Sequence, residues 1–237
     1  EAKVLFKFVE EGIHYIENGE KKFQELMDLE EGTLKIGAST TVTEHVLLPY
    51  LQEFQKRYPK IAISITNHLT SDLIRLLRNG TVDILALNLP TKEAPDLDIT
   101  PFLDVHDIFA VGKDKKELFK TEKNFQDLTM EEFIFQKRPS NTRAFLDSWL
   151  EKEQLGISPK FEVVSFNLVK DMTKIGMGIG YLTKEFVREE LSKGELFELK
   201  TTPKVPSREI GLVTLKNIYP SFAARAFIDL ILEKDKK

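Results

Sequence analysis

Strand-like and helix-like segments alternate along most of this chain, and the length of the connections between them constrains the fold more than any other feature. After Gly32, the pattern reads strand, helix, strand, helix, strand, at residues 33–38, 43–57, 61–66, 70–79 and 83–87. Each helical segment is long enough to cross a sheet and return the chain beside the previous strand in the same direction. The pattern therefore predicts an α/β unit with parallel strands covered by helices.

A second series of the same kind starts near residue 104. It predicts strands at 106–112, 133–136, 161–165, 178–182 and 208–215, and helices at 140–153, 167–175, 184–192 and 220–233. Residues 97–102 and 196–202 are extended connections without a Gly/Ser-rich tract. We therefore expect two similar lobes with a hinge, the last strand and helix returning to the first lobe. Lobe I is expected at residues 32–101 and 204–237, and lobe II at residues 102–203.

Residues 1–29 differ in pattern from the rest of the chain. Their apolar residues have the spacing of a heptad seam, at Leu5, Val9, Ile16, Phe23 and Leu26. One interpretation is a helix folded back onto its own domain, and the other is a linker helix that dimerises. We favour the second, because no early turn returns the chain to a core. Since the sequence opens at Glu1 inside this helical pattern, we also expect a longer protein upstream.

Composition argues against several kinds of chemistry. There is no cysteine, which excludes a disulfide scaffold, a thiolate zinc site and a cysteine nucleophile. The four histidines show no metal-ligand spacing, and no nucleophile elbow or phosphate-binding loop occurs, so we expect no metal, no cofactor and no catalytic residue. The net charge of −4 without a basic stripe argues against direct DNA binding. No apolar run reaches the roughly 18 residues that span a bilayer.

The only glycine cluster is Gly176-Met177-Gly178-Ile179-Gly180. A dinucleotide-binding loop requires the order strand, glycine loop, helix. Here a helical pattern precedes the glycines and a strand-like pattern follows them. The cluster therefore predicts a tight helix-to-strand turn.

Hydroxyl and amide residues recur where a strand ends and the next helix begins. In open α/β sheets these strand ends share one edge, at which ligands generally bind, and the helix starts there favour anions. Ordinary capping explains each segment taken singly. Four such segments, two in each lobe, predict a small polar ligand in a cleft between the lobes. They are Ser39-Thr40-Thr41, Thr70-Ser71, Ser140-Asn141-Thr142 and Ser165-Phe166-Asn167.

The run from Gly32 to Pro49, GTLKIGASTTVTEHVLLP, continues with FQKRYPKIAISI and ends in LLRNGTVDILAL. It closely resembles the effector-binding domain of LysR-type bacterial transcriptional regulators. Residues 167–182 resemble the same family's helix-turn-strand segment, with Thr183 where the family usually has proline. The resemblance implies two Rossmann-like lobes joined by two crossover strands, as in periplasmic solute-binding proteins. It also implies a linker helix that pairs subunits into a cytoplasmic homodimer or homotetramer, and a separate winged helix-turn-helix that binds DNA.

In the family, the effector lies between the lobes and its binding changes the state of the DNA-binding domain. The hydroxyls, amides and helix starts at the strand ends predict an effector that is anionic. The residues that the resemblance assigns to effector contact are Ser39, Thr40, Thr41, Thr70, Ser71, Asn88, Gln136, Ser140, Asn141, Thr142, Phe166 and Asn167.

Two other classes of protein share such lobes. A solute-binding protein of a transport system would carry a signal region in place of the heptad helix. An enzyme would need a catalytic acid or nucleophile at the cleft, where this sequence offers mainly neutral hydroxyl and amide groups. Both alternatives are less consistent with the sequence than a regulator.

Overall fold

The computed structural model describes residues 2–27, 32–90, 95–128 and 130–235. Its contacts divide the chain into two units. Unit 1 consists of Glu1–Leu87, Thr91–Leu103 and Ile210–Lys237, and unit 2 of Asn88–Pro90 and Asp104–Glu209. Two long strands, β4 (Leu97–Gly112) and β11 (Ser207–Leu215), contribute residues to both units.

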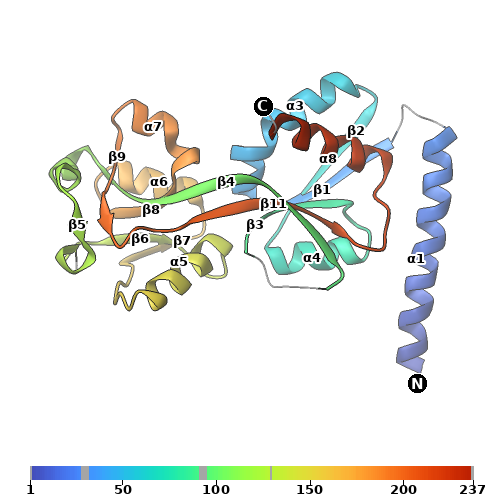
Figure 1. Cartoon of the computed structure of the whole chain (residues 1–237), viewed down its shortest axis with the longest axis horizontal. Helices are drawn as coiled ribbons and strands as arrows, with labels where there is room; N and C mark the ends of the chain where they lie inside the picture. Colours follow the sequence, from blue (N-terminus) through green and yellow to red (C-terminus); the bar gives the residue numbers. More distant parts are fainter. Residues whose placement is uncertain (1, 28–31, 91–94, 129, 236–237) are drawn as a thin grey trace. The chain divides into compact units, whose positions relative to one another are not determined.

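Unit 1 is a parallel α/β sandwich, as the spacing of its segments predicts. The strand β1 (Gly32–Ala38) pairs in parallel with β2 (Ile61–Asn67) on one side and β3 (Ile84–Asn88) on the other. The register places Gly32 opposite Ile61 and Ala38 opposite Asn67. Helix α4 (Thr70–Arg78) covers one face of the sheet, while α3 (Leu48–Arg57) and α8 (Phe222–Asp235) cover the other (Figure 1).

Burial on both faces explains why β3 is apolar at every position before Asn88. On one face, Leu73 and Leu77 of α4 pack with Leu85 and Leu87 of β3 in one buried cluster. The other face is closed where α3 and α8 meet through aromatic rings, among them Phe54. A parallel strand that is covered on both faces gains from apolar side chains at every position.

The helix predicted at residues 43–57 begins three residues earlier, at Thr40. It consists of α2 (Thr40–Val42), a π-helical turn η1 (Thr43–Leu47) and α3. The Leu48 N–H donates to the carbonyl oxygen of Thr43, which widens the turn. Pro49 accounts for this geometry, because proline has no N–H and its ring collides with the carbonyl of the preceding turn of an ordinary helix.

Unit 2 is a mixed sheet. The strand β6 (Phe133–Gln136) pairs in parallel with β7 (Phe161–Val163) and β8 (Ile179–Thr183), and β8 runs antiparallel to β4. Its helices α5 (Asn141–Lys152) and α6 (Phe166–Lys174) agree with the predicted segments. The last predicted helix of this unit is a 3-10 turn η4 (Lys184–Val187) followed by α7 (Arg188–Ser192).

The sequence did not predict five short elements of unit 2. Residues 196–202, expected to be a connection between lobes, contain β9 (Leu196–Glu198), which pairs with β4, and β10 (Thr201–Thr202), which pairs with β5 (Lys123–Asn124). The chain passes from unit 2 to unit 1 later, within β11 between Glu209 and Ile210. Before β6 lie two 3-10 helices, η2 (Lys113–Lys120) and η3 (Phe125–Leu128).

An aromatic cluster forms the core of unit 2. Phe109 of β4 lies at its centre and is 1% exposed. Its ring centroid lies 5.0 Å from that of Phe125, 5.2 Å from that of Tyr181 and 6.2 Å from that of Trp149. These rings fix the positions of β4, β8 and α5 around one point, so the polar residues at the ends of these elements are held on a rigid base.

The glycine cluster forms the predicted tight turn from α6 to β8. Gly176 has a φ of +82°, a backbone conformation that residues other than glycine rarely adopt. At Gly178 a β-carbon would lie 2.4 Å from the carbonyl oxygen of Glu132. Both glycines are therefore required by backbone geometry and close packing.

We expect Gly178→Ala to lower the free energy of unfolding by about 1–3 kcal/mol, because the new methyl group meets backbone and the strands must move apart. Urea denaturation measures this difference. Gly156→Ala is the matched control, since a β-carbon at Gly156 has no atom within 4 Å, and its stability should stay close to that of the wild type. Equal stability of the two variants would contradict the close approach at Gly178.

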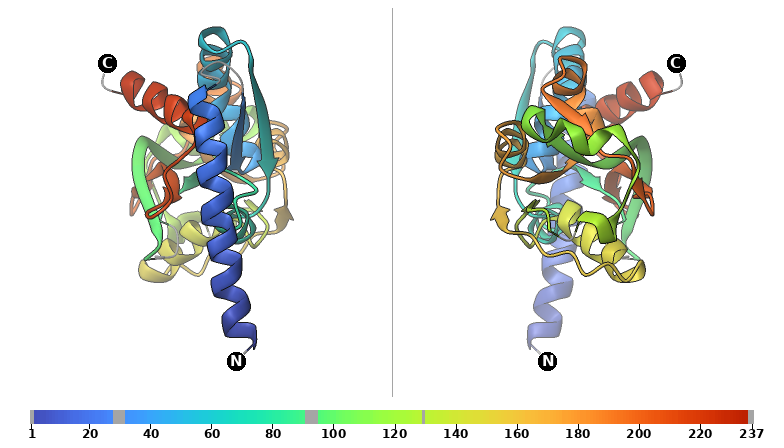
Figure 2. Two further views of the ribbon diagram at one scale, coloured as in Figure 1. Left: turned by 90° about the vertical axis from the view of Figure 1, so that its right-hand side faces the viewer. Right: turned by 90° about the vertical axis from the view of Figure 1, so that its left-hand side faces the viewer.

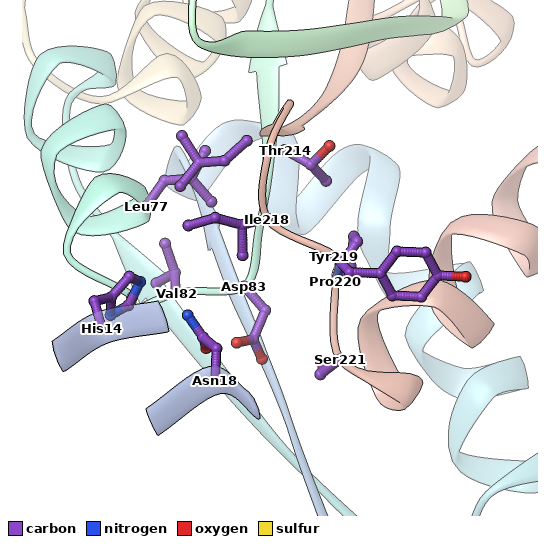
Figure 3. A pocket seen from close by; sticks show the side chains of 12 residues that line it. His14, Asn18, Leu77, Val82, Asp83, Thr214, Ile218, Tyr219, Pro220 and Ser221 are labelled. Carbon is purple, nitrogen blue, oxygen red and sulfur yellow. The ribbon is translucent and has the colours of Figure 1, made fainter. Parts of the chain in front are cut away.

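The N-terminal helix α1 (Ala2–Met27) is one continuous helix (Figure 2). It contacts the rest of unit 1 where His14 lies over Gly80, beside a small cavity of about 50 Å³ (Figure 3). The side chains of Phe23 and Leu26 lie outside the described ones. In the part of the chain that the structure describes, no helix is both long and apolar enough to cross a membrane.

Among the side chains of α1 that the structure describes, the exposed large apolar ones lie on the heptad face. Counted in heptads from the predicted seam, each of these occupies a seam position or a position that flanks the seam. They are Leu5, Phe6, Phe8, Val9, Ile13, Tyr15 and Ile16, with exposures between 48% and 68%.

Candidate functional site

In unit 1, the predicted residues after β1 are held by a small hydrogen-bond network. The Ser39 hydroxyl accepts a hydrogen bond of 3.2 Å from the Val42 N–H and caps the helix start. The Asn67 amide nitrogen, at the end of β2, donates to the carbonyl oxygen of Ala38 at 3.1 Å and to the Thr43 hydroxyl at 3.0 Å. The ends of two neighbouring strands are thereby fixed together. Thr40 is exposed and Thr41 is half-buried.

The start of α4 holds the other predicted pair of unit 1. Leu69 occupies the cap position, and no side chain caps this helix. Thr70 is half-buried and Ser71 is exposed. Capping therefore does not explain these two hydroxyls, and the first N–H groups of α4 have no side-chain acceptor. Such a helix start favours an acceptor group from a ligand or from water.

In unit 2, the structure brings Asn88, at the end of β3, beside the start of α5. The Asn141 amide nitrogen donates to the Asn88 carbonyl oxygen at 3.3 Å. Next to Asn141, the Ser140 hydroxyl caps α5 by accepting from the Arg143 N–H at 3.5 Å. The Gln136 amide nitrogen donates to the Val164 carbonyl oxygen at 3.3 Å. Four predicted residues thus lie at one edge of this unit.

The structure buries two of the three remaining predicted residues of unit 2. Thr142 is only 8% exposed and Phe166 only 4%. The Phe166 ring packs edge to face on Phe186, with centroids 5.8 Å apart. Asn167 is half-buried, and the residue that caps α6 is Ser165, which accepts from the Leu168 N–H. Phe166 is therefore a packing residue of unit 2 and is not exposed at this edge.

The side chain of Arg143 points into unit 2, a direction that the sequence leaves open. Its side chain is 5% exposed and pairs with Asp147 at 2.8 Å and with Glu162 at 2.5 Å. Although burial opposes it, hydrogen bonds from Arg138 and Arg143 hold the pKa of Asp147 below its usual value. The charge of Arg143 is thereby neutralised within unit 2, and it is not available to a ligand as a free cation.

A buried ion pair that the sequence analysis missed lies beside Asn88. Arg208 of β11 and Asp107 of β4 are each 4% exposed and form a two-pronged pair at 2.5 and 2.9 Å. Asp107 also accepts from the Thr183 hydroxyl at 2.7 Å and from the Tyr181 hydroxyl at 3.0 Å. The remaining guanidinium nitrogen of Arg208, Nη1, donates to the side-chain oxygen of Asn88.

Each carboxylate oxygen of Asp107 and each guanidinium nitrogen of Arg208 has a hydrogen-bond partner, which is the condition for a buried charge to be tolerated. Burial raises the pKa of Tyr181 well above its usual value, and the negative charge of Asp107 acts in the same direction. The phenol therefore keeps its proton and remains a donor. Thr183, at the position where the family usually has proline, both donates to Asp107 and accepts from Arg208 at 3.0 Å. The sequence does not single out this pair, because β4 also carries Asp98 and Asp104, and β11 also carries Glu209.

The described part of the chain contains no group of three or more His, Asp or Glu side chains that could hold a metal ion. The arrangement can instead present donors: amide nitrogens, hydroxyls and helix N–H groups at strand ends. Its two buried arginines are neutralised by carboxylates.

Comparison with known proteins identifies the class of protein to which this chain belongs. The model of the LysR substrate binding domain matches residues 28–236, so the chain belongs to this family. It is the effector-binding domain of a LysR-type transcriptional regulator.

Relatives and solved structures agree. The HTH-type transcriptional regulator CysL of Bacillus subtilis is 28% identical over 207 residues, which cover 81% of this chain and 69% of CysL. The regulatory domain of CcmR from Synechocystis, solved with 2-PG, superimposes with a TM-score of 0.78 at 23% identity, covering 87% of this chain and 99% of that one. The effector binding domain of QuiR, solved with shikimate, superimposes with a TM-score of 0.72 at 24% sequence identity, covering 87% of this chain and 98% of that one. These relatives are regulators, not transport proteins.

Proposed function

We propose that this domain senses an anionic metabolite and transmits its binding to a winged helix-turn-helix DNA-binding domain of the same regulator. The observation that carries the proposal is the donor-rich edge of each unit: the uncapped start of α4 in unit 1, and Asn88 with Asn141 in unit 2. Helix-start N–H groups stabilise a nearby anion by about 0.3–1 kcal/mol each when exposed, and by up to about 2 kcal/mol when partly buried. That one ligand contacts both edges stays a prediction from the sequence.

The buried arginines favour the same proposal in a specific way. Because carboxylates neutralise Arg143 and Arg208, an anion would be held by neutral donors. Recognition by neutral donors leaves binding dependent on geometry, so a small anion can shift the domain between conformations of similar energy. We propose no catalytic role, since these strand ends offer hydroxyls and amides rather than a free acid or nucleophile. From its membership of the family we also propose that the protein is cytoplasmic and that it contacts DNA only through another domain.

A thermal-shift screen of the purified chain tests this function. The panel comprises sulfate, carboxylates, phosphorylated acids, nucleobases, uncharged sugars and polyamines. A ligand present at 100 times its dissociation constant stabilises the folded state by about 2.7 kcal/mol, a difference that the melting temperature reveals. Stabilisation by an anionic metabolite is the expected result. Stabilisation by no compound of the panel would contradict the sensing role.

Ser39→Val is expected to weaken binding of the stabilising anion at least tenfold, because valine removes both the hydroxyl and the helix cap at the end of β1. Loss of the cap alone costs about 1 kcal/mol of stability, so the fold should persist. Isothermal titration calorimetry measures the affinity. Ser39→Thr is the matched control, because threonine keeps the hydroxyl, and its affinity should stay within about threefold of the wild type. Normal binding by Ser39→Val would remove this residue from the site.

We further propose that α1 associates with α1 of a second copy of the chain. The exposed apolar residues of the helix share one face, whose pattern suits a coiled-coil seam. The competing interpretation, a helix that only packs on its own unit, draws support from the contact between His14 and Gly80. That contact involves a different side of the helix, so the two arrangements can coexist.

A further inference from the structure

The carboxamide of Asn88 has a defined orientation, and Arg208 sets it. A guanidinium group carries donors and no acceptor, so the Asn88 atom that meets Arg208 must be the side-chain oxygen. The contact with Arg208 therefore identifies which atom of this amide is the oxygen and which is the nitrogen. The amide nitrogen with its two N–H groups points to the other side of the carboxamide.

These N–H groups have no acceptor among the residues that the structure describes. The hydrogen bonds of Asn88 use its side-chain oxygen, which accepts from Arg208, and its backbone oxygen, which accepts from Asn141. Asn88 is half-buried, and its amide nitrogen is not among the enclosed polar atoms that lack a partner. The nitrogen is thus open to water or to a ligand at the edge that Asn141 shares.

Arg208 itself is unsuited to bind a ligand directly. It is 4% exposed, and Asp107 engages it through two nitrogens. Thr183 accepts from the guanidinium as well, at 3.0 Å. The guanidinium is held from three sides by Asp107, Thr183 and Asn88. Because Asp107 and Thr183 fix its plane, the position of the arm that reaches Asn88 is fixed too.

We propose that Arg208 is a positioning residue for effector recognition: it turns Asn88 so that N–H donors, and not the side-chain oxygen, face the ligand. The site then selects a ligand that presents an acceptor oxygen at this point, as a carboxylate, sulfate or phosphate does. An ammonium group, which has only donors, finds no acceptor there. This inference rests on the proposed sensing function and adds to it the residue that sets the specificity.

The test uses the whole chain and three probes: sulfate, shikimate and the diamine putrescine. Asn88→Asp keeps an oxygen for Arg208 but replaces the outward N–H groups by a second oxygen, with little change in shape. Calorimetry is expected to show that the wild type binds at least one of the two oxyanions, and that Asn88→Asp binds it at least tenfold more weakly. The matched control is Asn217→Asp, the same change at an exposed asparagine of unit 1, which should bind as the wild type does.

A second variant tests Arg208 directly. Arg208→Lys keeps a charge for Asp107 but loses the fork that reaches Asn88. Its oxyanion affinity is expected to fall at least tenfold, while circular dichroism shows a folded protein. In the wild type, the side-chain amide resonance of Asn88 should shift when the oxyanion is added, a response that a merely structural arginine would not require.

Three outcomes would overturn the inference: unchanged oxyanion affinity in Asn88→Asp, an unmoved Asn88 amide resonance at saturation, or binding of neither oxyanion. Preference for putrescine would also overturn it, while leaving the sensing function intact. The sensing function itself fails only if the wider metabolite panel stabilises nothing, so the two failures are distinguishable.

Discussion

Asp107→Asn is expected to lower the free energy of unfolding by about 3–5 kcal/mol, the largest single-residue effect that we predict for stability. The substitution removes the charge that compensates Arg208 and turns an amide nitrogen toward a guanidinium nitrogen, which can only donate. Because both residues of the pair are 4% exposed, water cannot replace the lost carboxylate. Urea denaturation followed by circular dichroism measures the change.

Two comparisons make this result specific. Asp98→Asn is the same substitution at an exposed position of the same strand, β4, and should change stability by less than about 0.5 kcal/mol. The double variant Asp107→Leu with Arg208→Met leaves no buried charge and should recover at least half of the loss. If Asp107→Asn stayed within 1 kcal/mol of the wild type, the ion pair would be hydrated in solution and could not fix Asn88.

The alternation of strands and helices predicts the architecture of unit 1 because its contacts are local. A parallel strand must be reached by a crossover, so the segments from Thr33 to Leu87 leave few alternatives for the order of β1, β2 and β3. The π-helical turn before Pro49 escapes such an analysis. A pattern of apolar spacing does not show how the backbone adjusts to a missing N–H.

The candidate residues predicted from the sequence lie where capping and strand ends coincide, as at Ser39, Ser140 and Asn141, and their contact with an effector stays a prediction. The pair of Asp107 with Arg208 was missed because the two residues are 101 positions apart. Neither strand shows by itself that β4 and β11 approach each other. Both strands carry other charged residues, among them Asp104 and Glu209, so only the fold shows which two form the buried pair.

The seam of α1 leads to the other large expected effect. Ile16→Glu should weaken self-association at least 100-fold, which corresponds to about 2.7 kcal/mol. Ile16 is 65% exposed in the single chain, in line with Val9 one heptad earlier. In a symmetric pair of helices the substitution appears twice, so two carboxylates would have to lose water at the centre of the seam.

Sedimentation velocity over a range of concentrations measures this effect. Ile16→Leu keeps an apolar side chain in the seam and should associate nearly as well as the wild type. Glu10→Lys changes the charge of the same helix outside the seam, so it separates a seam effect from a general charge effect. A sedimentation profile of Ile16→Glu that matches the wild type would contradict the seam. The contact of His14 with Gly80 would then indicate that α1 serves its own unit alone.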